Sequence, residues 1–186
     1  MGCRFEYYLL TKDENSLMEM KELMRQWEHA YIEYALDFAG AGLYEEAILF
    51  LQSYVAGAGK VYPMIHYALG YFYACQGDNN KALDCYRKAE QDDHSYCFPN
   101  RIEEVVILQN ALALNSQGAK AAYSLGNFWY VARQYENAIS CWETSVAIAP
   151  DFPTVWRNLS LAYYNKQNDK TKALDALEKA FQLDEN

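Results

Sequence analysis

The chain has 186 residues, of which 52% are hydrophobic, and it carries 17 Tyr and 4 Trp but only 4 Pro and 9 Gly. This length suits one compact domain or a short repeat array, and the scarcity of Pro and Gly favours an all-α protein over a turn-rich β protein. A formal net charge of −9, without any run of Lys or Arg, excludes nucleic acid and anionic membrane surfaces as natural partners.

The N-terminal segment, residues 1–27, predicts two short helices separated by a polar turn. It has no basic region followed by a long apolar run, and no stretch of the chain approaches the ~20 apolar residues that a membrane-spanning helix needs. Five Cys without a CxxC pair indicate neither a disulfide framework nor a zinc site. We therefore expect buried thiols in a reducing environment and a cytoplasmic location.

A repeated pattern occupies most of the remaining sequence. The segments ALGYFYACQGDNNKALDCYRKA and SLGNFWYVARQYENAISCWETS align without a gap, NLSLAYYNKQNDKTKALDALEKA matches them with one extra residue in its turn, and YALDFAGAGLYEEAILFLQSYV is a weaker copy. Ala47 and Ala82, like Ala138 and Ala173, lie 35 residues apart. This length fits two helices of about a dozen residues joined by short turns. Because a single helical hairpin cannot bury its apolar stripe, the units are expected to stack.

The clearest unit has its large and small residues at fixed offsets, namely Leu125, Gly126, Trp129, Tyr135, Ala138, Trp142 and Pro150. This pattern resembles the tetratricopeptide repeat, although Ser145 replaces the usual Ala and Ala122 replaces the first aromatic residue. The resemblance implies an all-α fold, a right-handed α-solenoid of stacked antiparallel helix pairs with about eleven helices. Repeat units are expected at residues 28–62, 63–96, 119–152 and 153–186.

One unit is incomplete. Between Ala89 and Ala111 only 22 residues separate equivalent positions, which is about 12 short of a full unit. We interpret residues 97–118 as a fused unit, with one helix over 98–115 and with Pro99 in its first turn, where a missing N–H costs little. This helix should bend the array or interrupt its groove, so residues 119–166 are expected to form the better binding site.

No residue pattern predicts catalysis, a cofactor or a metal site. AGAGK, residues 56–60, lacks the first Gly and the final Ser or Thr of a phosphate loop, and it fits a helix-ending turn. His66 and Cys75 lie nine residues apart on one predicted helix and therefore on roughly opposite faces. The acids of the loop DDHSYC, and the acid pairs at 45–46 and 103–104, are interpreted as solvated. The chain is not expected to be an enzyme.

The first helix of each unit divides into two faces when 100° is allowed per residue. Trp156, Leu159 and Tyr163 fall on one face and are expected in the core. The other face corresponds to positions that, in tetratricopeptide repeats, line the concave groove where peptides bind. The candidate groove residues by this correspondence are Tyr67, Tyr71, Lys120, Tyr123, Asn127, Tyr130, Arg157, Leu161, Tyr164 and Asn165.

Tyr side chains combined with Asn, Lys and Arg can stack on a ligand and hydrogen-bond to an extended backbone or a carboxylate. The expected function is therefore a non-catalytic protein-interaction scaffold whose partner is a protein or peptide.

Three other interpretations stay open. Asn127 and Asn158 have the 31-residue spacing of the carboxylate clamp in chaperone-binding members of the family, but Tyr123 stands where the clamp has its first Lys. The loop and the last unit also resemble repeat segments of large bacterial proteins that carry a sugar-epimerase-like β domain, which implies an accessory region of a carbohydrate-related enzyme. The last helix, 170–183, could instead pair with a second copy in a homodimer through Leu174, Leu177 and Phe181.

Overall fold

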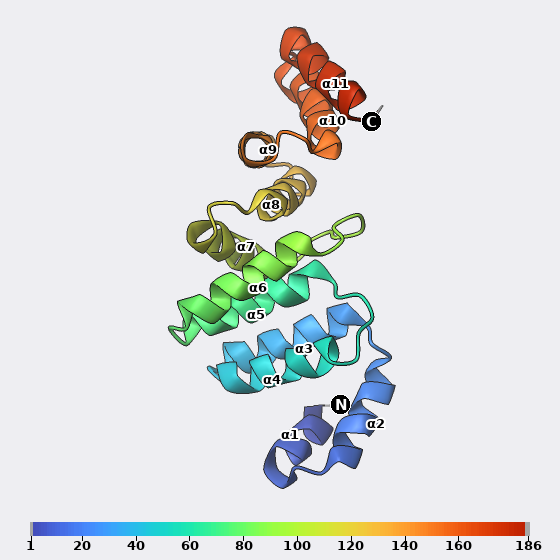
Figure 1. Ribbon diagram of the computed structural model, residues 1–186, viewed down its shortest axis with the longest axis vertical. Coiled ribbons are helices and arrows are strands. Elements are labelled where there is room, and N and C mark those ends of the chain that lie inside the picture. The colour runs from blue at the N-terminus through green and yellow to red at the C-terminus, as the bar shows by residue number, and fades with distance from the viewer. Residues whose placement is uncertain (1, 185–186) are drawn as a thin grey trace. The chain divides into compact units, whose positions relative to one another are not determined.

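The structure, a computed structural model, describes residues 2–184, and within this range it contains eleven α-helices, one π-helix and no strand. The helices form two compact units, Met1–Asp93 and His94–Asn186. Figure 1 shows consecutive helices of each unit lying beside each other as antiparallel pairs. The expected all-α class, built from stacked helix pairs with about eleven helices, is confirmed.

The first unit comprises α1 (Gly2–Thr11), α2 (Glu14–Met24), α3 (Glu28–Gly40), α4 (Tyr44–Val55), α5 (Pro63–Cys75) and α6 (Asn79–Gln91). The second unit comprises α7 (Ile102–Leu114), α8 (Ala119–Val131), α9 (Tyr135–Ile148), α10 (Pro153–Ala162), the π-helix η1 (Tyr163–Gln167) and α11 (Lys170–Asp184). The four repeats correspond to the packed pairs α3 with α4, α5 with α6, α8 with α9, and α10 with α11. None of the described helices has the length and apolar character that crossing a bilayer requires.

The turn inside each repeat uses the same backbone geometry. A residue just beyond the end of the first helix has a positive φ in all four turns, with values of 80° at Gly42, 82° at Gly77, 61° at Arg133 and 54° at Asn168. In the first three turns the next N–H reaches back five positions to a helix carbonyl, as from Leu43 N to Phe38 O at 2.9 Å. This Schellman arrangement satisfies carbonyl groups that a helix end leaves without partners.

The π-helix absorbs the extra residue of the last repeat. There the N–H of Asp169 reaches back six positions, to Tyr163 O at 3.0 Å, instead of five. Asn168 still has the positive φ, and Asp169 still caps the second helix, since its Oδ1 accepts from Lys172 N at 3.0 Å. The insertion therefore widens one helical turn and leaves α11 with the same side-chain cap as α6, where Asp78 accepts from Lys81 N.

Two of the hairpins are packed most closely where a glycine of the first helix faces an aromatic ring of the second. A Cβ added at Gly70 would overlap the ring of Tyr86, and one added at Gly126 would overlap the ring of Trp142. The absence of a side chain lets the helices approach at these points. In the last repeat Ser160 stands at this position, and its hydroxyl donates to Ala173 O at 2.7 Å.

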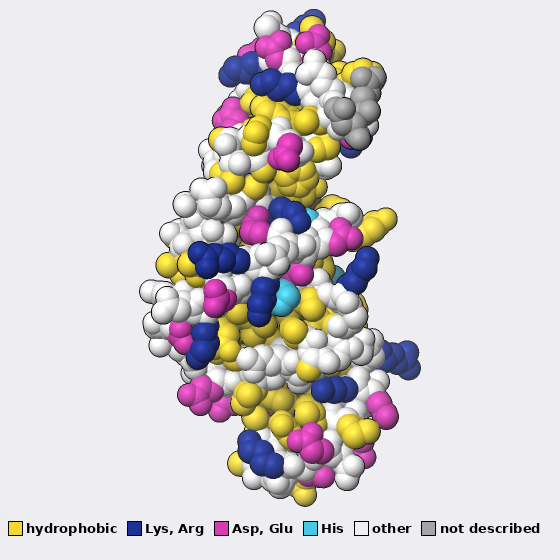
Figure 2. Space-filling model, viewed as in Figure 1, with side chains coloured by type: hydrophobic (Ala, Val, Ile, Leu, Met, Phe, Trp, Pro, Cys, Tyr) yellow, Lys and Arg dark blue, Asp and Glu magenta, His cyan; other side chains and the backbone are white. Residues whose placement is uncertain are grey.

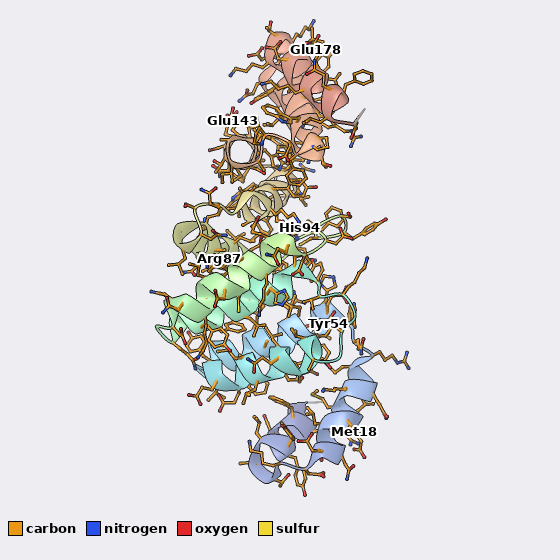
Figure 3. All side chains as sticks on the ribbon, viewed as in Figure 1. Met18, Tyr54, Arg87, His94, Glu143 and Glu178 are labelled. Carbon is orange, nitrogen blue, oxygen red and sulfur yellow. The ribbon has the colours of Figure 1, made fainter. Side chains whose placement is uncertain are left out.

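The core of the second unit buries the residues that the angular pattern assigns to it, with one exception. Leu159 and Tyr163 are buried, whereas Trp156 is only partly buried and donates its indole N–H to Pro150 O at 2.8 Å. The hydroxyl of Tyr163 donates to Glu143 Oε1 of α9 at 2.8 Å (Glu143 is labelled in Figure 3). Burial, followed by this carboxylate, raises the pKa of Tyr163.

Ser145, which departs from the Ala usual at its position in the repeat, is fully buried. Its hydroxyl donates to the carbonyl of Ala119 at 2.7 Å, so α9 is hydrogen-bonded to the first residue of α8. The substitution adds a buried polar group whose hydrogen bond is satisfied.

The helix α7 begins later than the sequence indicates, at Ile102, and Pro99 is buried in the loop before it. Glu104 accounts for this start, because its Oε2 accepts from Asn100 N at 2.7 Å and from Arg101 N at 3.0 Å. These bonds fold the loop back over the helix N-terminus, as the Glu of a capping box does. The expectation that the acids at 103–104 are solvated is wrong for Glu104, which is 1% exposed.

Candidate partner-binding groove

The second unit carries a groove of about 420 Å³ along the first helices of its two repeats, which we name the α8–α10 groove. Five candidate residues line it together, namely Tyr123, Asn127, Tyr130, Arg157 and Leu161. In Figure 2 hydrophobic side chains reach the surface in this part of the chain. Half of the residues predicted from repeat positions are thus gathered around one concave surface.

Repeat geometry explains why these residues meet. Positions in α8 and α10 are offset by 34 residues, so Arg157 takes the place of Tyr123, and Leu161 takes the place of Asn127. Side chains four residues apart lie on the same face of a helix. Asn158 Nδ2 of α10 lies 3.5 Å from Asn127 Oδ1 of α8, which joins the two helices along the groove.

Aromatic rings form the floor of the α8–α10 groove. Tyr123 is only 9% exposed, and its ring centroid lies 5.0 Å from that of Phe152. The ring centroid of Tyr130 lies 5.4 Å from that of Trp142. Leu161, in contrast, is 47% exposed at the rim. Tyr123 therefore supports the fold as well as the groove, and Leu161 is free to contact a ligand.

The polar groups of the α8–α10 groove are amides and one cation. Asn127 Oδ1 accepts from Trp142 Nε1 at 3.2 Å and from Asn158 Nδ2 at 3.5 Å. Arg157 is exposed. Among the described residues no Asp or Glu lines this groove, although the chain as a whole has a formal net charge of −9. The groove is thus a cationic site on an acidic chain.

Six lining residues are absent from the sequence-based set, and they are Ser95, Phe98, Val131, Trp142, Thr154 and Asn158. Periodicity could have identified Thr154, because it occupies the repeat position of Lys120. Trp142 follows the core pattern of the second helix and is only 3% exposed. Ser95 and Phe98 come from the irregular loop before α7, to which no helical period applies.

Three candidate residues of this unit lie away from the α8–α10 groove lining. Lys120 is half-buried, and Tyr164 is 56% exposed. Asn165 donates to Leu161 O at 2.9 Å and lines a separate cavity of about 420 Å³. Beside it the Lys166 ammonium lies 4.2 Å from the centroid of the Tyr135 ring. Asn165, in the π-helix η1, thus lines a different cavity from the groove to which its repeat position assigns it.

The two candidates of the first unit are placed differently. Tyr67 is fully buried, and its hydroxyl donates to Glu90 Oε1 at 2.6 Å. Tyr71 is half-buried, and burial followed by the neighbouring Cys75 raises its pKa. Tyr67 has no exposed surface to offer a partner.

The first unit has a cavity of its own, of about 410 Å³, which sequence reasoning missed. It lies among α4, α5 and α6, and its lining includes Gln52, His66, Tyr73, Lys81, Cys85 and Lys88. Most of its polar groups are already bonded. Gln52 donates to the Tyr73 hydroxyl at 2.9 Å, and His66 Nδ1 lies 2.6 Å from Asp92 Oδ2. Lys81 pairs with Asp78 at 2.8 Å.

Groups suited to metal binding are dispersed. Within residues 2–184 no three His, Cys, Asp or Glu side chains gather closely enough to hold a metal ion. His94, labelled in Figure 3, is buried, and its Nδ1 lies 3.2 Å from Ser124 Oγ. Cys97 of the same loop is buried as well. The loop DDHSYC thus contributes packing and a side-chain contact from His94 to α8.

Comparison with known families identifies the repeats. The tetratricopeptide repeat family model matches residues 65–91 and 154–186. These segments are tetratricopeptide repeats. They fall within the second and fourth units that the sequence pattern predicts, at 63–96 and 153–186. Tetratricopeptide repeats typically serve as protein-interaction modules.

Solved structures of tetratricopeptide proteins are similar to the chain. A crystal structure of MamA is 20% identical, with 97% of this chain and 94% of that chain covered and a TM-score of 0.45. A MamA fragment from Desulfovibrio magneticus RS-1 is 18% identical, with 85% and 95% covered and a TM-score of 0.42. YrrB, described as a tetratricopeptide repeat protein with an unusual peptide-binding site, is 18% identical, with 91% and 93% covered and a TM-score of 0.41.

Proposed function

We propose that the chain is a non-catalytic scaffold that binds a peptide segment of a partner protein in the α8–α10 groove. The observation that carries the proposal is the lining of this groove, where aromatic rings, two amides and one Arg from two successive repeats surround about 420 Å³ without an acidic residue. Rigid helices hold these side chains, so little conformational entropy is lost when a ligand binds.

The lining also indicates the chemistry of the ligand. Leu161 and Tyr130 offer apolar and aromatic surface, and Phe98 is 57% exposed beside them. Arg157 can form a charge-assisted hydrogen bond to a carboxylate. A peptide with an acidic residue next to a large apolar residue satisfies both, and the acidic chain would repel such a peptide elsewhere.

The test begins with peptides selected from a random 12-residue display library on the whole protein, whose dissociation constants are then measured by calorimetry. Leu161→Asp and Arg157→Ala should each weaken binding by about tenfold or more, as substitutions at a binding hot spot do. Tyr123 is a poor target because it is buried in the core.

Leu177→Asp is the matched control, since Leu177 is 51% exposed on α11 and lies outside the groove. It should leave peptide affinity unchanged, and circular dichroism should show native helix content in every variant. Selected peptides that bind Leu161→Asp and Arg157→Ala as tightly as the unmodified protein would overturn the proposal, as would a selection that yields no binder.

A homodimer through α11 is a second candidate, favoured by one observation. Leu174, Leu177 and Phe181 are 55%, 51% and 62% exposed and follow one another at helical spacing. A contiguous exposed apolar stripe is typical of an interface. Light scattering over a wide concentration range should then show a mass that doubles, and Leu177→Asp should abolish the increase while Leu161→Asp preserves it. A constant monomer mass rejects this candidate.

The five cysteines support a reducing location for either function. All of them are free thiols, and Cys85 and Cys97 are buried. We infer a cytoplasmic protein, which isolation of the native protein with all thiols reduced would support and a native disulfide would contradict.

A further inference from the structure

Trp142 joins the core of the second unit to the amides of the α8–α10 groove. Its side chain is 3% exposed, and its ring is held against Gly126, where no side chain intervenes. The indole Nε1 donates at 3.3 Å to Tyr123 O and at 3.2 Å to Asn127 Oδ1. A buried, immobile donor therefore faces the side chain of Asn127.

This contact decides which end of the Asn127 amide faces the groove. An indole N–H can only donate, so it selects the amide oxygen and rejects the amide nitrogen. Asn158 Nδ2 approaches the same oxygen at 3.5 Å, which adds a second donor on that side. Among the described residues, neither Asn127 Nδ2 nor Asn158 Oδ1 has a hydrogen-bond partner of its own. The groove thus keeps one amide donor and one amide acceptor, on neighbouring helices.

We propose that Trp142 is a positioning residue, which fixes the Asn127 amide so that its Nδ2 donates to a ligand carbonyl while Asn158 Oδ1 accepts from a ligand N–H. One residue of an extended chain exposes its N–H and C=O on the same side, as in an antiparallel ladder. The ligand is therefore an extended peptide main chain rather than a helix, whose main-chain groups are already bonded. This inference rests on the proposed function of the α8–α10 groove.

The arrangement is particular to the second unit. At the equivalent positions 56 residues earlier, the first unit has Tyr86 in place of Trp142 and Tyr71 in place of Asn127. A phenol in place of the indole and a phenol in place of the amide cannot reproduce the same donor and acceptor pair. The donor at position 142 and the amide at position 127 are therefore not a feature of every repeat. They come from the particular residues of the α8–α9 repeat.

A measurement without ligand tests the positioning role by itself. In the free, full-length protein the Asn127 side-chain amide should show an NMR order parameter close to that of a rigid backbone, which is about 0.85. Trp142→Phe should lower this order parameter towards about 0.6, the value of a flexible group. Trp156→Phe is the matched control, because it removes an indole N–H that donates to Pro150 O instead. An Asn127 order parameter that is unchanged in Trp142→Phe overturns the proposal, whether or not any peptide binds.

Binding then tests the consequence, with the selected peptides as probes. Trp142→Phe should weaken binding by about fivefold in the unmodified protein and by nothing further in the Asn127→Ala background, because the two residues act through one hydrogen bond. Equal losses in both backgrounds would show that Trp142 acts only on packing and would overturn the inference, while the groove itself would stand. Should Trp142→Phe fail to fold, Trp142→Met also removes the donor, with a side chain that adapts to the space left in the core, and serves for both measurements.

Discussion

At Gly126 the distance between two helices depends on a missing methyl group. The Cα faces the ring of Trp142, and a Cβ there would also come within 3.1 Å of Ala138 O, which is backbone and cannot rotate away. The same ring carries the indole N–H that donates to Asn127. A side chain at this position would therefore disturb both the packing of α8 on α9 and the lining of the groove.

We expect Gly126→Ala to lower the free energy of unfolding by about 1–3 kcal/mol, the usual cost of overpacking a core. Urea unfolding followed by circular dichroism measures this difference. Gly40→Ala is the control, because a Cβ at Gly40 meets no atom within 4 Å and its φ is not positive. That control should be neutral or stabilising by up to about 1 kcal/mol. Equal effects of the two substitutions would mean that contact with Trp142 and Ala138 O is unimportant.

Tyrosine positions show how far single residues could be predicted. Tyr67, Tyr123 and Arg157 occupy one repeat position, and the angular pattern assigns all three to the same face. The structure buries Tyr67 completely and Tyr123 almost completely, and leaves Arg157 exposed. Glu90 supplies a hydrogen bond that keeps Tyr67 inside, and its counterpart 56 residues on is the apolar Val146. The burial of a residue depends on such neighbours from other helices, and the periodicity of a single helix gives no information about them.

The turn between α10 and α11 differs from the equivalent turns of the other three repeats. The first three turns close after five residues and this one closes after six, because η1 contains the additional residue. A π-helical turn is rare in proteins and is found mostly as a single turn. Asn165 of this turn lines a cavity together with Tyr135 and Lys166.

Deleting Gln167 should restore the shorter turn. Its exposed side chain makes one hydrogen bond, to Glu136 Oε2 at 3.2 Å, and Asn168 and Asp169 remain to end one helix and cap the next. We expect the deletion variant to keep its helix content. Its free energy of unfolding, measured with urea, should be unchanged or higher by up to about 1 kcal/mol. Gln167→Ala, which keeps the chain length, is the control. A loss of several kcal/mol in the deletion variant alone would show that the widened turn is needed for packing.

Helix boundaries could be predicted within the regular repeats, but not in the incomplete unit that contains α7. Helix pairs follow from the 35-residue spacing of alanines and from glycine or polar residues in the turns. The start of α7 does not, because it depends on Glu104 folding back onto Asn100 and Arg101. The three-residue spacing from Arg101 to Glu104 is a capping-box signal, but Arg is not a usual first member of it. The loop that brings Phe98 to the groove is set by the same contact.

At the scale of the whole molecule, burial of ionisable groups is distributed over both units. In the first, burial raises the pKa of Cys85 to about 11 and, followed by Tyr54, that of Tyr31 to about 12. In the second, burial raises the pKa of Cys141 to about 11. The expectation of buried thiols is confirmed for Cys85 and Cys97 and is wrong for Cys3 and Cys75, which are exposed. At neutral pH Cys85, Cys141 and Tyr31 are protonated in the folded chain, and each becomes an acid of ordinary strength when the chain unfolds.

Stability should therefore fall in alkali. A group whose folded pKa exceeds its unfolded value stabilises the folded state below the unfolded pKa and loses this contribution as pH rises through the folded one. For Cys85 and Cys141 the window runs from the ordinary thiol pKa of 9.0 to the folded-state pKa of about 11. We expect the urea midpoint to be constant from about pH 7 to 8.5, because thiols of the unfolded chain begin to ionise only at about 8.5 and above. The midpoint should then decrease from about pH 9 to 11. The double variant Cys85→Ala, Cys141→Ala should start from a lower midpoint and decline less steeply, most clearly below about pH 10, because the tyrosines with raised pKa values, such as Tyr31, and the general repulsion of an acidic chain remain. An identical decline in both proteins would assign the alkaline loss to these tyrosines and to net charge instead of to the two thiols.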